Sequence, residues 1–259
     1  MSATPAQFSV ELTNRHIVAI DGGTATGKGR LIEELSQLMR LKGLPVLHIS
    51  TGSLYRAVGY AGLQYTRSLV KSKSRKEPAE VTAEALKRLR SVPVDRLLDL
   101  ATKRRIEMHG GQVWMDGQLA SMEEQLKAAG VGMAASIVSV PVPVRRFVND
   151  ITRRQINEFD GYVVIDGRDV TNGVTPDAPL KLLLTVAPHI AAQRSKEHTV
   201  EEIIERDRAD RDKPVGALRH PDDPGEGVIV LPTDEHTPES VRDHVYALMQ
   251  KTFPELPEI

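Results

Sequence analysis

The chain contains 259 residues, which is enough to bury a full core as one α/β domain with insertions or as two small domains. Its 34 Lys and Arg residues balance 35 Asp and Glu residues to a net charge of −1, which excludes the global basic field of a typical nucleic-acid-binding protein. It has no cysteine, no signal-peptide pattern and no apolar run of membrane-spanning length, so we expect a cytoplasmic protein without disulfides, zinc–thiolate sites or membrane partners.

The segment 17–30 predicts a phosphate-binding P-loop. An apolar strand expected at 16–21 leads into the glycine loop GGTATGKG at 22–29, and a helical pattern then runs to about residue 42. In this order the backbone N–H groups of the loop and the start of the helix face an anion, and Lys28 reaches the β- and γ-phosphates of a nucleotide. The alternative is an ordinary strand-to-helix turn with a solvated lysine.

The elements up to residue 130 divide into a core part and an insertion. A strand is expected at 46–49, and a helix capped by the sequence STGS at 50–53 runs from Leu54 towards Tyr65. From Arg67 a polar, basic sequence predicts a mobile loop, followed by helices at 79–90 and 94–102 and a hairpin of 105–108 with 112–115. We therefore expect a lead-in at 1–15, the first part of the core at 16–66 and an inserted subdomain at 67–130.

The remaining chain, 131–259, is expected to complete the core. Helical patterns occupy 131–140, 143–159, 199–210 and 238–251, and a further helix starts at Pro188. Apolar strands are expected at 162–166, 181–186 and 228–231. Strands that alternate with helices predict an α/β fold with a mostly parallel, three-layer sheet.

Ligands of open α/β sheets gather at the carboxyl ends of the strands, where loops of this chain carry charged side chains. Arg56 follows the capped turn after the second strand and suits a phosphate group. Asp166 ends a buried strand, as does a Walker B carboxylate near the P-loop magnesium, and Arg168 and Asp169 follow it. Simpler interpretations are an exposed helical arginine for Arg56 and an ion pair that fixes a turn for Arg168 and Asp169.

The charged sequence ERDRADRDK at 205–213 allows two interpretations. Arginines on the mobile lid of a kinase close over the transferring phosphoryl group and exclude water, whereas most such charge runs are solvated helices. A separate group of arginines at 145, 146, 153 and 154 lacks the interleaved aromatic residues of a nucleic-acid site. The histidines show no metal-binding spacing.

Taken together, these motifs resemble those of the cytidylate kinases, a family of P-loop nucleoside monophosphate kinases. The resemblance spans about 16–248 and rests on the order and spacing of GGTATGKG (22–29), TGSLYRAV (51–58), VWMDGQ (113–118), VGMAASIVSVPVPVR (131–145), VVIDGRDV (163–170), PDAPLKLLLT (176–185) and ERDRAD (205–210). It implies a parallel-sheet core, an insert that binds the nucleoside monophosphate, and a lid around 194–215. It also implies a monomeric enzyme that transfers the γ-phosphoryl group of ATP to CMP or dCMP with Mg²⁺ as cofactor.

The resemblance further implies which residues bind and react. The ATP-binding loop would comprise Gly22, Gly23, Thr24, Ala25, Thr26, Gly27, Lys28, Gly29 and Arg30. The CMP-binding residues would be Thr51, Gly52, Tyr55, Arg56, Ser136, Arg145, Arg168, Asp169, Asp210 and Lys213. Within these sets Arg56 and Arg168 would grip the acceptor phosphate, and Ser136, Arg145 and Asp169 would read the cytosine edge. Lys28, Arg168 and Arg206 would be catalytic, and Asp166 would hold magnesium, directly or through water.

Several positions depart from the family pattern. Arg30 replaces a threonine, Ala25 replaces a glycine, and Ser50 replaces an acidic residue. Lys213 replaces an arginine, so a point charge stands in for a bidentate fork, and only 196–199 connects the two lid helices. These departures leave two alternatives open: a P-loop kinase of another small acceptor, and a catalytically degenerate nucleotide-binding protein with a regulatory role.

Overall fold

The structure is a computed structural model that describes residues 9–71, 77–120, 125–195 and 198–258. The chain divides into two compact units, a first unit of 1–10 and 50–155 and a core unit of 11–49 and 156–259. Parts of the predicted segments lie outside the described residues: 1–8 of the lead-in, 72–76 and 121–124 of the insert, 196–197 of the lid connection and residue 259 at the end of the core. The insert expected at 67–130 falls within the first unit, and its limits stay a prediction.

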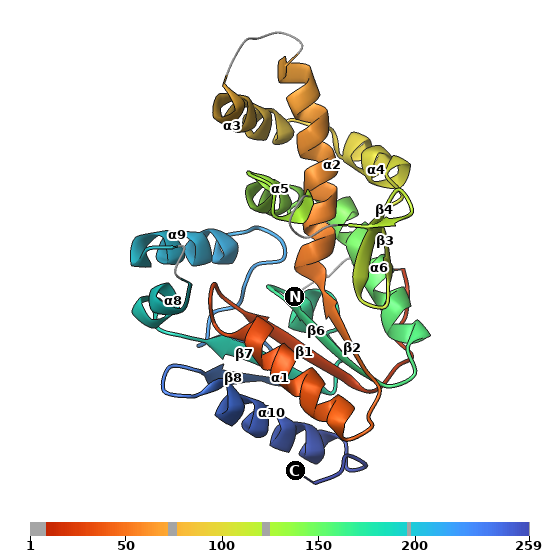
Figure 1. The fold of residues 1–259 in the computed structure, drawn as a ribbon, viewed down its shortest axis with the longest axis vertical. Helices are drawn as coiled ribbons and strands as arrows, with labels where there is room; N and C mark the ends of the chain where they lie inside the picture. Colours follow the sequence, from red (N-terminus) through yellow and green to blue (C-terminus); the bar gives the residue numbers. More distant parts are fainter. Residues whose placement is uncertain (1–8, 72–76, 121–124, 196–197, 259) are drawn as a thin grey trace. The chain divides into compact units, whose positions relative to one another are not determined.

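The core unit is built on a five-stranded sheet with the strand order β2-β6-β1-β7-β8 (Figure 1). Its strands are β1 (Ile17–Gly22), β2 (Val46–Ser50), β6 (Tyr162–Gly167), β7 (Leu180–Thr185) and β8 (Val228–Pro232). The central strand β1 runs parallel to both β6 and β7. Every residue of β1 is buried, as expected for a parallel strand that is covered on both faces. The predicted α/β fold class is confirmed.

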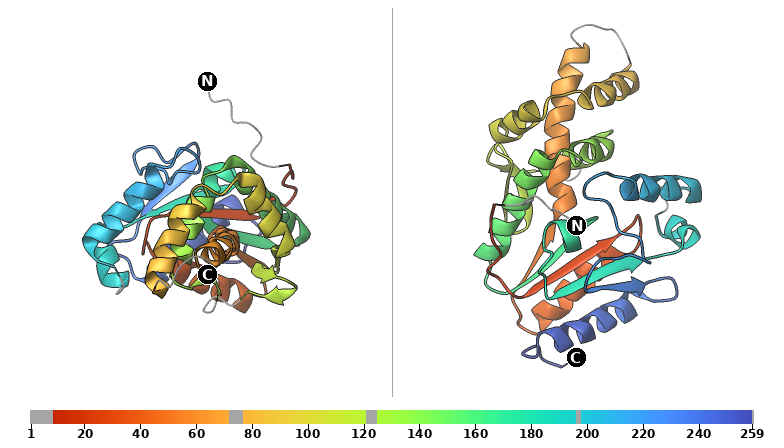
Figure 2. Two further views of the ribbon diagram at one scale, coloured as in Figure 1. Left: turned by 90° about the horizontal axis from the view of Figure 1, so that it is seen from above. Right: turned by 180° about the vertical axis from the view of Figure 1, so that it is seen from behind.

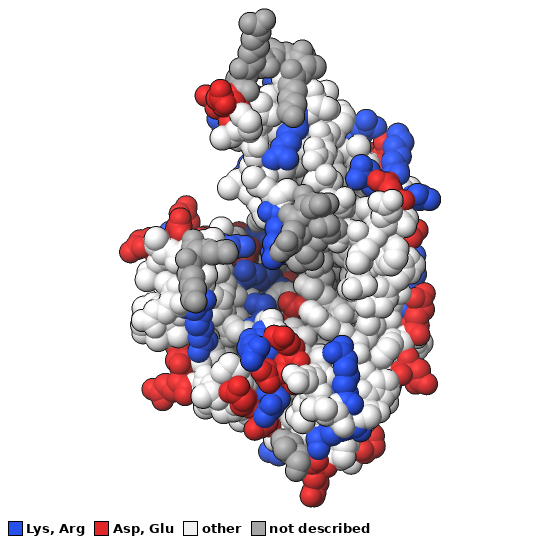
Figure 3. Space-filling view, viewed as in Figure 1, with Lys and Arg blue, Asp and Glu red and all other residues white. Residues whose placement is uncertain are grey.

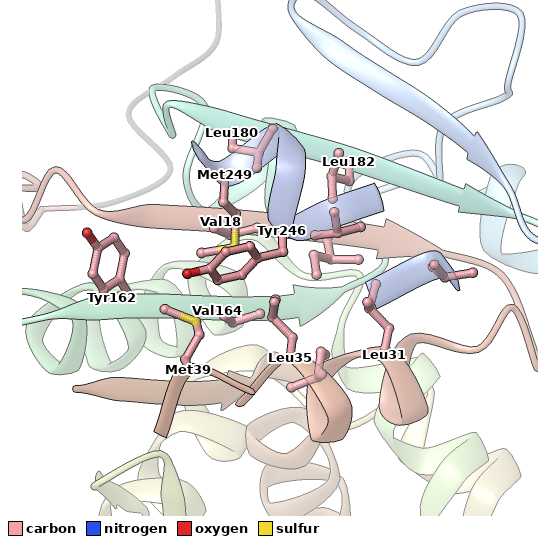
Figure 4. Packing of buried hydrophobic residues seen from close by; sticks show 14 of the residues in the cluster. Val18, Leu31, Leu35, Met39, Tyr162, Val164, Leu180, Leu182, Tyr246 and Met249 are labelled. Atoms are coloured by element: carbon pink, nitrogen blue, oxygen red, sulfur yellow. The ribbon is translucent and has the colours of Figure 1, made fainter. Parts of the chain in front are cut away.

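Two long helices cover one face of this sheet. The helices of the core unit are α1 (Lys28–Leu41), α7 (Val170–Gly173), α8 (Pro188–Ser195), α9 (Val200–Arg211) and α10 (Pro238–Thr252). Figure 4 shows Leu35 and Met39 of α1 facing Tyr246 of α10 and Val164 of β6, all of them buried. This apolar layer packs the sheet against α1 and α10. The P-loop connects the end of β1 to the start of α1.

The first unit is mainly helical. It contains α2 (Thr51–Lys71), α3 (Pro78–Leu89), α4 (Val94–Lys103), α5 (Val131–Val138), most of α6 (Val142–Glu158), and the small sheet of β3 (Glu107–His109), β4 (Gln112–Met115) and β5 (Gln118–Leu119). Helices α3, α4 and α5 pack around α2, which is seen end-on in the left view of Figure 2. Gly59 of α2 permits the contact with α5, because a Cβ there would lie 2.7 Å from the backbone nitrogen of Ala135.

The predicted elements are present, and the largest error concerns α2. The loop predicted from Arg67 is wrong as far as Lys71, because α2 continues to that residue. Val70 is 3% exposed, so the polar residues around it form the solvated side of a helix whose apolar stripe continues. The short elements β5 and α7 were not predicted, because two to four residues carry too little periodicity to be recognised.

The surface of the core unit carries both charges. On the face shown in Figure 3, acidic and basic side chains alternate over α1 and its neighbours. The mixed surface agrees with the near-zero net charge of the chain.

Along the described ranges no single helix is long and apolar enough to cross a membrane. Only α5 and α6 taken together, with a bend of 104° between them, meet that length and composition.

Candidate functional site

The P-loop between β1 and α1 adopts backbone conformations that favour glycine. Gly27 has φ of +90° and directly precedes α1. Ala25 has φ of +53°, the left-handed conformation, at the position where the family pattern has glycine. That conformation costs a residue with a Cβ about 1–2 kcal/mol. A Cβ on Gly22 would lie 2.8 Å from the carbonyl oxygen of Leu184, so the loop lies close against β7.

The side chain of Lys28 folds back onto this loop. Its Nζ donates hydrogen bonds to the carbonyl oxygens of Gly22 at 2.6 Å and Gly23 at 2.8 Å. Removal of the ammonium group from water, and next the positive charge of Arg168, lower the pKa of Lys28 from 10.5 to about 7. A phosphate group at the loop would reverse this effect, because an adjacent anion favours the charged lysine.

Helix α9 contributes a carboxylate to the P-loop. Asp207 Oδ1 accepts a hydrogen bond from the Thr24 N–H at 2.9 Å and another from the Thr24 hydroxyl at 2.8 Å. A Cβ on Gly23 would clash with the Asp207 carboxylate, so a larger residue at this position would displace the Asp207 side chain from the loop. Negatively charged oxygens are the ligands that such a loop of N–H groups favours, and here a side chain supplies them.

Arg168, the first residue after β6, joins the P-loop to α9. Its Nη1 donates to the Gly22 carbonyl oxygen at 3.0 Å, and its Nη2 donates to the Thr24 hydroxyl at 3.3 Å. On α9, its Nε lies 3.3 Å from Asp210 Oδ2 and its Nη1 lies 3.5 Å from Asp207 Oδ1. The guanidinium therefore lies at the loop where a nucleotide phosphate is expected, and all three of its nitrogens have partners.

The other predicted residues of α9 divide into two groups. Asp210 is 9% exposed, and besides Arg168 it pairs with Lys213, which follows the end of α9, at 2.8 Å, so these two predicted CMP ligands lie together. Arg206, by contrast, contacts a histidine before α9: its Nη1 lies 3.1 Å from His198 Nε2. Within the described ranges no hydrogen bond or ion pair joins Arg206 to the P-loop. Its predicted catalytic role stays a prediction.

Asp21, the residue before Gly22, binds the turn after β6. Its carboxylate is 1% exposed and accepts hydrogen bonds from the Val170 N–H at 2.8 Å, the Thr171 N–H at 3.0 Å and the Thr171 hydroxyl at 2.6 Å. Burial raises the pKa of Asp21 above its ordinary value, although these donors and the charge of Lys28 act to lower it. The end of β1 and the start of α7 are thereby tied together.

A cavity of about 530 Å³ borders the P-loop within the core unit. Its lining includes Thr26, Lys28, Asp166, Arg194, Thr233 and His236. Arg194 is fixed there by hydrogen bonds from Nη1 to the Thr233 hydroxyl at 2.9 Å and from Nη2 to the Thr233 carbonyl oxygen at 2.6 Å. The volume lies in the range of small-molecule sites.

Asp166, the residue predicted to hold magnesium, lies on the wall of this cavity. Its Oδ1 is 2.8 Å from His48 Nε2. The described part of the chain holds no group of three or more His, Cys, Asp or Glu residues that could enclose a metal. Magnesium in nucleotide sites needs one or two carboxylates, because phosphates and water supply the other ligands. The donor set at Asp166 therefore fits Mg²⁺ that is bound together with ATP.

Arg30, one of the departures from the family pattern, is engaged in ion pairs. Its Nη2 lies 2.6 Å from Glu34 Oε1 and its Nη1 lies 3.2 Å from Glu33 Oε2, both on the same helix. The predicted ATP-binding role of Arg30 stays a prediction.

The predicted CMP-binding residues fall in both units. Thr51, Gly52, Tyr55 and Arg56 occupy the beginning of α2, and Ser136 and Arg145 lie on α5 and α6. Around the turn between α5 and α6, Arg145 Nη1 donates to the Ser139 carbonyl oxygen at 3.4 Å, and the Ser139 hydroxyl donates to the Ser136 carbonyl oxygen at 2.9 Å. Arg168, Asp169, Asp210 and Lys213 belong to the core unit. Their binding of CMP stays a prediction.

Sequence reasoning missed two carboxylates of the core unit. For Asp21 the sequence did contain an indication: a charged residue at the end of a buried strand needs a partner. Asp207 had none, because the charged helix contains several carboxylates whose spacing does not say which one contacts the P-loop.

Comparison with known proteins identifies the family. The family profile "Cytidylate kinase" matches residues 18–251. A cytidylate kinase of Methylobacterium sp. (strain 4-46) is 33% identical over 219 residues, which cover 80% of this chain and 85% of that protein. Cytidylate kinases of Aquifex aeolicus and Caldanaerobacter subterraneus are 25% and 28% identical over 246 residues, which cover 90% of this chain and 96% and 94% of theirs. With a match over most of its length, the chain belongs to the cytidylate kinase family.

Proposed function

We propose that the protein is a nucleoside monophosphate kinase that transfers the γ-phosphoryl group of ATP to CMP or dCMP. The position of Arg168 carries this proposal, because one guanidinium contacts the P-loop at Gly22 and α9 at Asp210. A positive charge between a phosphate-binding loop and a charged helix is what phosphoryl transfer requires. Membership of the family supplies the acceptor, since the relatives are named cytidylate kinases.

The P-loop and the adjoining cavity form the donor side of this proposal. The phosphates of ATP would take the N–H groups of the loop, and Lys28 would exchange its bonds to the Gly22 and Gly23 carbonyl oxygens for phosphate oxygens. The two hydrogen bonds to Thr233 fix the orientation of the Arg194 guanidinium, and a purine ring can stack on its planar face. Both groups line the same cavity, which supports ATP as the donor.

The acceptor side draws on residues of each unit. In the core unit, Arg168 has the fork that suits the phosphate of CMP, and Asp210 and Lys213 lie beside it. In the first unit, Arg56 is assigned to the same phosphate, and Thr51, Gly52 and Tyr55 are also assigned to CMP. Cytosine presents ring acceptors and an exocyclic amino group, so the donors of Ser136 and Arg145 together with the carboxylate of Asp169 match its edge.

Catalysis in this proposal consists of positioning and charge stabilisation. A phosphate oxygen of CMP attacks the γ-phosphorus in line, and the bond to the β-phosphate oxygen breaks to release ADP. Lys28, Arg168 and Arg206 spread positive charge around the transferring group. No general base is needed, because the CMP phosphate is anionic near neutral pH. When bound, Mg²⁺ neutralises charge on the β- and γ-phosphates, and Asp166 is assigned to hold it through water.

A coupled assay for ADP release tests this function. We expect turnover with ATP and CMP or dCMP to exceed turnover with UMP and with phosphorylated acceptors that are not nucleotides. Failure to form ADP with any of the three nucleotides would refute the proposal. Faster turnover of a non-nucleotide acceptor would favour a different small-molecule kinase. Tight binding of ATP or CMP without turnover would favour a regulatory nucleotide-binding protein. The cytoplasmic location and the monomeric state stay predictions.

A further inference from the structure

The buried carboxylate of Asp21 has no direct part in the proposed reaction. It lies on β1 immediately before the P-loop, and in the sheet register it is opposite Gly167, the residue that precedes Arg168. Its side chain is 1% exposed. Asp21 therefore connects the strand that leads into the donor loop with the turn that carries Arg168 and Asp169.

The three hydrogen bonds of Asp21 use both oxygens of its carboxyl group as acceptors. Oδ1 accepts from the Val170 N–H, and Oδ2 accepts from both the N–H and the hydroxyl of Thr171. A backbone N–H can only donate, so both oxygens must act as acceptors. An amide at this position would turn its NH₂ group towards one of these donors and leave that donor unpaired.

The turn is bonded internally as well as to Asp21. The Asn172 side-chain amide donates to the Thr171 hydroxyl at 3.0 Å, the Gly173 N–H donates to the Asp169 carbonyl oxygen at 2.9 Å, and the Thr175 hydroxyl donates to the Val170 carbonyl oxygen at 3.0 Å. The Thr171 hydroxyl thus connects Asp21 to the Asn172 side chain, because it donates to the one and accepts from the other. The backbone that carries Arg168 and Asp169 is therefore fixed both by Asp21 and by hydrogen bonds within the turn.

We propose that Asp21, through Thr171 and the Val170 N–H, is a positioning residue for the acceptor nucleotide. It fixes the turn from which Arg168 and Asp169 reach CMP, so its contacts set the affinity for CMP more than the affinity for ATP. The inference rests on the proposed CMP kinase function, because it concerns the acceptor side of that site.

The sharpest test alters Thr171 and leaves the charge of Asp21 unchanged. Thr171→Val removes one of the three donors at constant shape, and we expect KM and Kd for CMP to rise about tenfold because a buried acceptor loses its partner. KM for ATP should stay within about twofold, since the P-loop contacts are unaltered. Thr171→Ser keeps the hydroxyl and should restore the affinity for CMP. Asp21→Asn should weaken CMP binding further.

Thr66→Val is the matched control. The Thr66 hydroxyl is also buried, and it donates to the carbonyl oxygens of Gly62 and Leu63 within α2. This variant should lose stability to a similar degree and leave the ratio of the two KM values unchanged. If Asp21→Asn does not fold, the Thr171 pair still decides the question.

Two results would overturn the inference: an equal rise of both KM values in Thr171→Val, or failure of Thr171→Ser to restore CMP binding. Calorimetry with CMP alone separates this failure from failure of the proposed function. An unaltered protein that does not bind CMP would refute the proposed function and the inference with it. An unaltered protein that binds CMP, with the same Kd in Thr171→Val, would refute only the role of Asp21.

Discussion

Two neighbouring parts of the core unit, the P-loop and the turn after β6, are held by different kinds of contact. In the P-loop, Lys28 bonds to carbonyl oxygens of its own loop, and the Thr24 N–H binds the Asp207 carboxylate. In the turn, the Val170 and Thr171 N–H groups bind Asp21, which is buried below them. In the proposed reaction, the phosphates of ATP compete for the partners in the loop and for none of the contacts of Asp21. The loop is therefore suited to exchange its partners, and the turn to stay fixed.

The energetic reason lies in what an exchange leaves behind. When a phosphate replaces Asp207 at the Thr24 N–H, one anion takes the place of another at that donor. Breaking the contacts of Asp21 would leave a buried carboxylate without donors, which is far more costly.

Loss of the Lys28 ammonium should have the largest effect. In Lys28→Met the loop keeps its glycines and loses the cation that moves onto the phosphates, so kcat should fall about a hundred- to a thousandfold. Steady-state kinetics with ATP and CMP measures the effect. Lys251→Met removes a lysine in the last turn of α10 and serves as the control, with kcat unchanged. A fall of less than about tenfold in Lys28→Met would contradict the role given to the loop.

Removal of the competing carboxylate should strengthen ATP binding. Asp207→Asn retains the shape of the side chain and removes its charge, so calorimetry should show Kd for ATP falling about tenfold. Asp212→Asn removes the same charge from the C-terminal end of α9, where Asp212 is 68% exposed and pairs with Arg208. This control should leave the affinity nearly unaltered. An unchanged or weaker affinity in Asp207→Asn would show that Asp207 does not compete with ATP.

The lowered pKa of Lys28 predicts proton uptake on ATP binding. Its pKa of about 7 lies below the ordinary 10.5, so between these values the unfolded chain holds more protons and the free energy of unfolding should rise with pH. Phosphates favour the charged lysine, so ATP binding near pH 8 should take up a proton at Lys28. Calorimetry in two buffers of different ionisation enthalpy measures this uptake. Lys28→Met should lack it, and equal uptake in that variant would contradict the assignment.

The strain at Ala25 predicts a small gain in stability. With φ of +53°, Ala25→Gly relieves about 1–2 kcal/mol of strain and loses about 0.5–1 kcal/mol of chain entropy, so unfolding in urea should show a gain of about 0.5 kcal/mol. Gly110, in the other unit, has φ of +56° with open space around it, and Gly110→Ala introduces the same strain. Opposite signs are expected for the two variants. A loss of stability in Ala25→Gly would contradict the strain.

Local patterns predicted the fold and the P-loop well. The apolar runs of β1, β6 and β7 and the glycine spacing before Lys28 are properties of short segments, and the structure has the strands and the loop in these places. The continuation of α2 past Arg67 was missed because its solvated side, read alone, resembles a loop. The part of that helix beyond residue 66 depends on packing, including the burial of Val70, that a local pattern does not report.

The contacts that distinguish the loop from the turn could not be predicted from the sequence. Asp21 and Thr171 are 150 residues apart, and Thr24 and Asp207 are 183 residues apart, so no periodicity links them. The sequence does place Arg168 and Asp210 among the expected CMP-binding residues, and the structure brings these two side chains together. It does not indicate that Arg206 turns towards His198 or that Arg30 is engaged by carboxylates of its own helix.

The central claim, that this protein phosphorylates CMP with ATP, is tested most directly by identifying the products. Phosphorus NMR of the protein with Mg²⁺, ATP and CMP should show the CMP and ATP signals decreasing as the signals of CDP and ADP appear in equal amounts. The same mixture with Lys28→Met should remain almost unchanged over that time. ADP that accumulates together with inorganic phosphate while CMP stays intact would contradict the claim, because the phosphoryl group would then have gone to water.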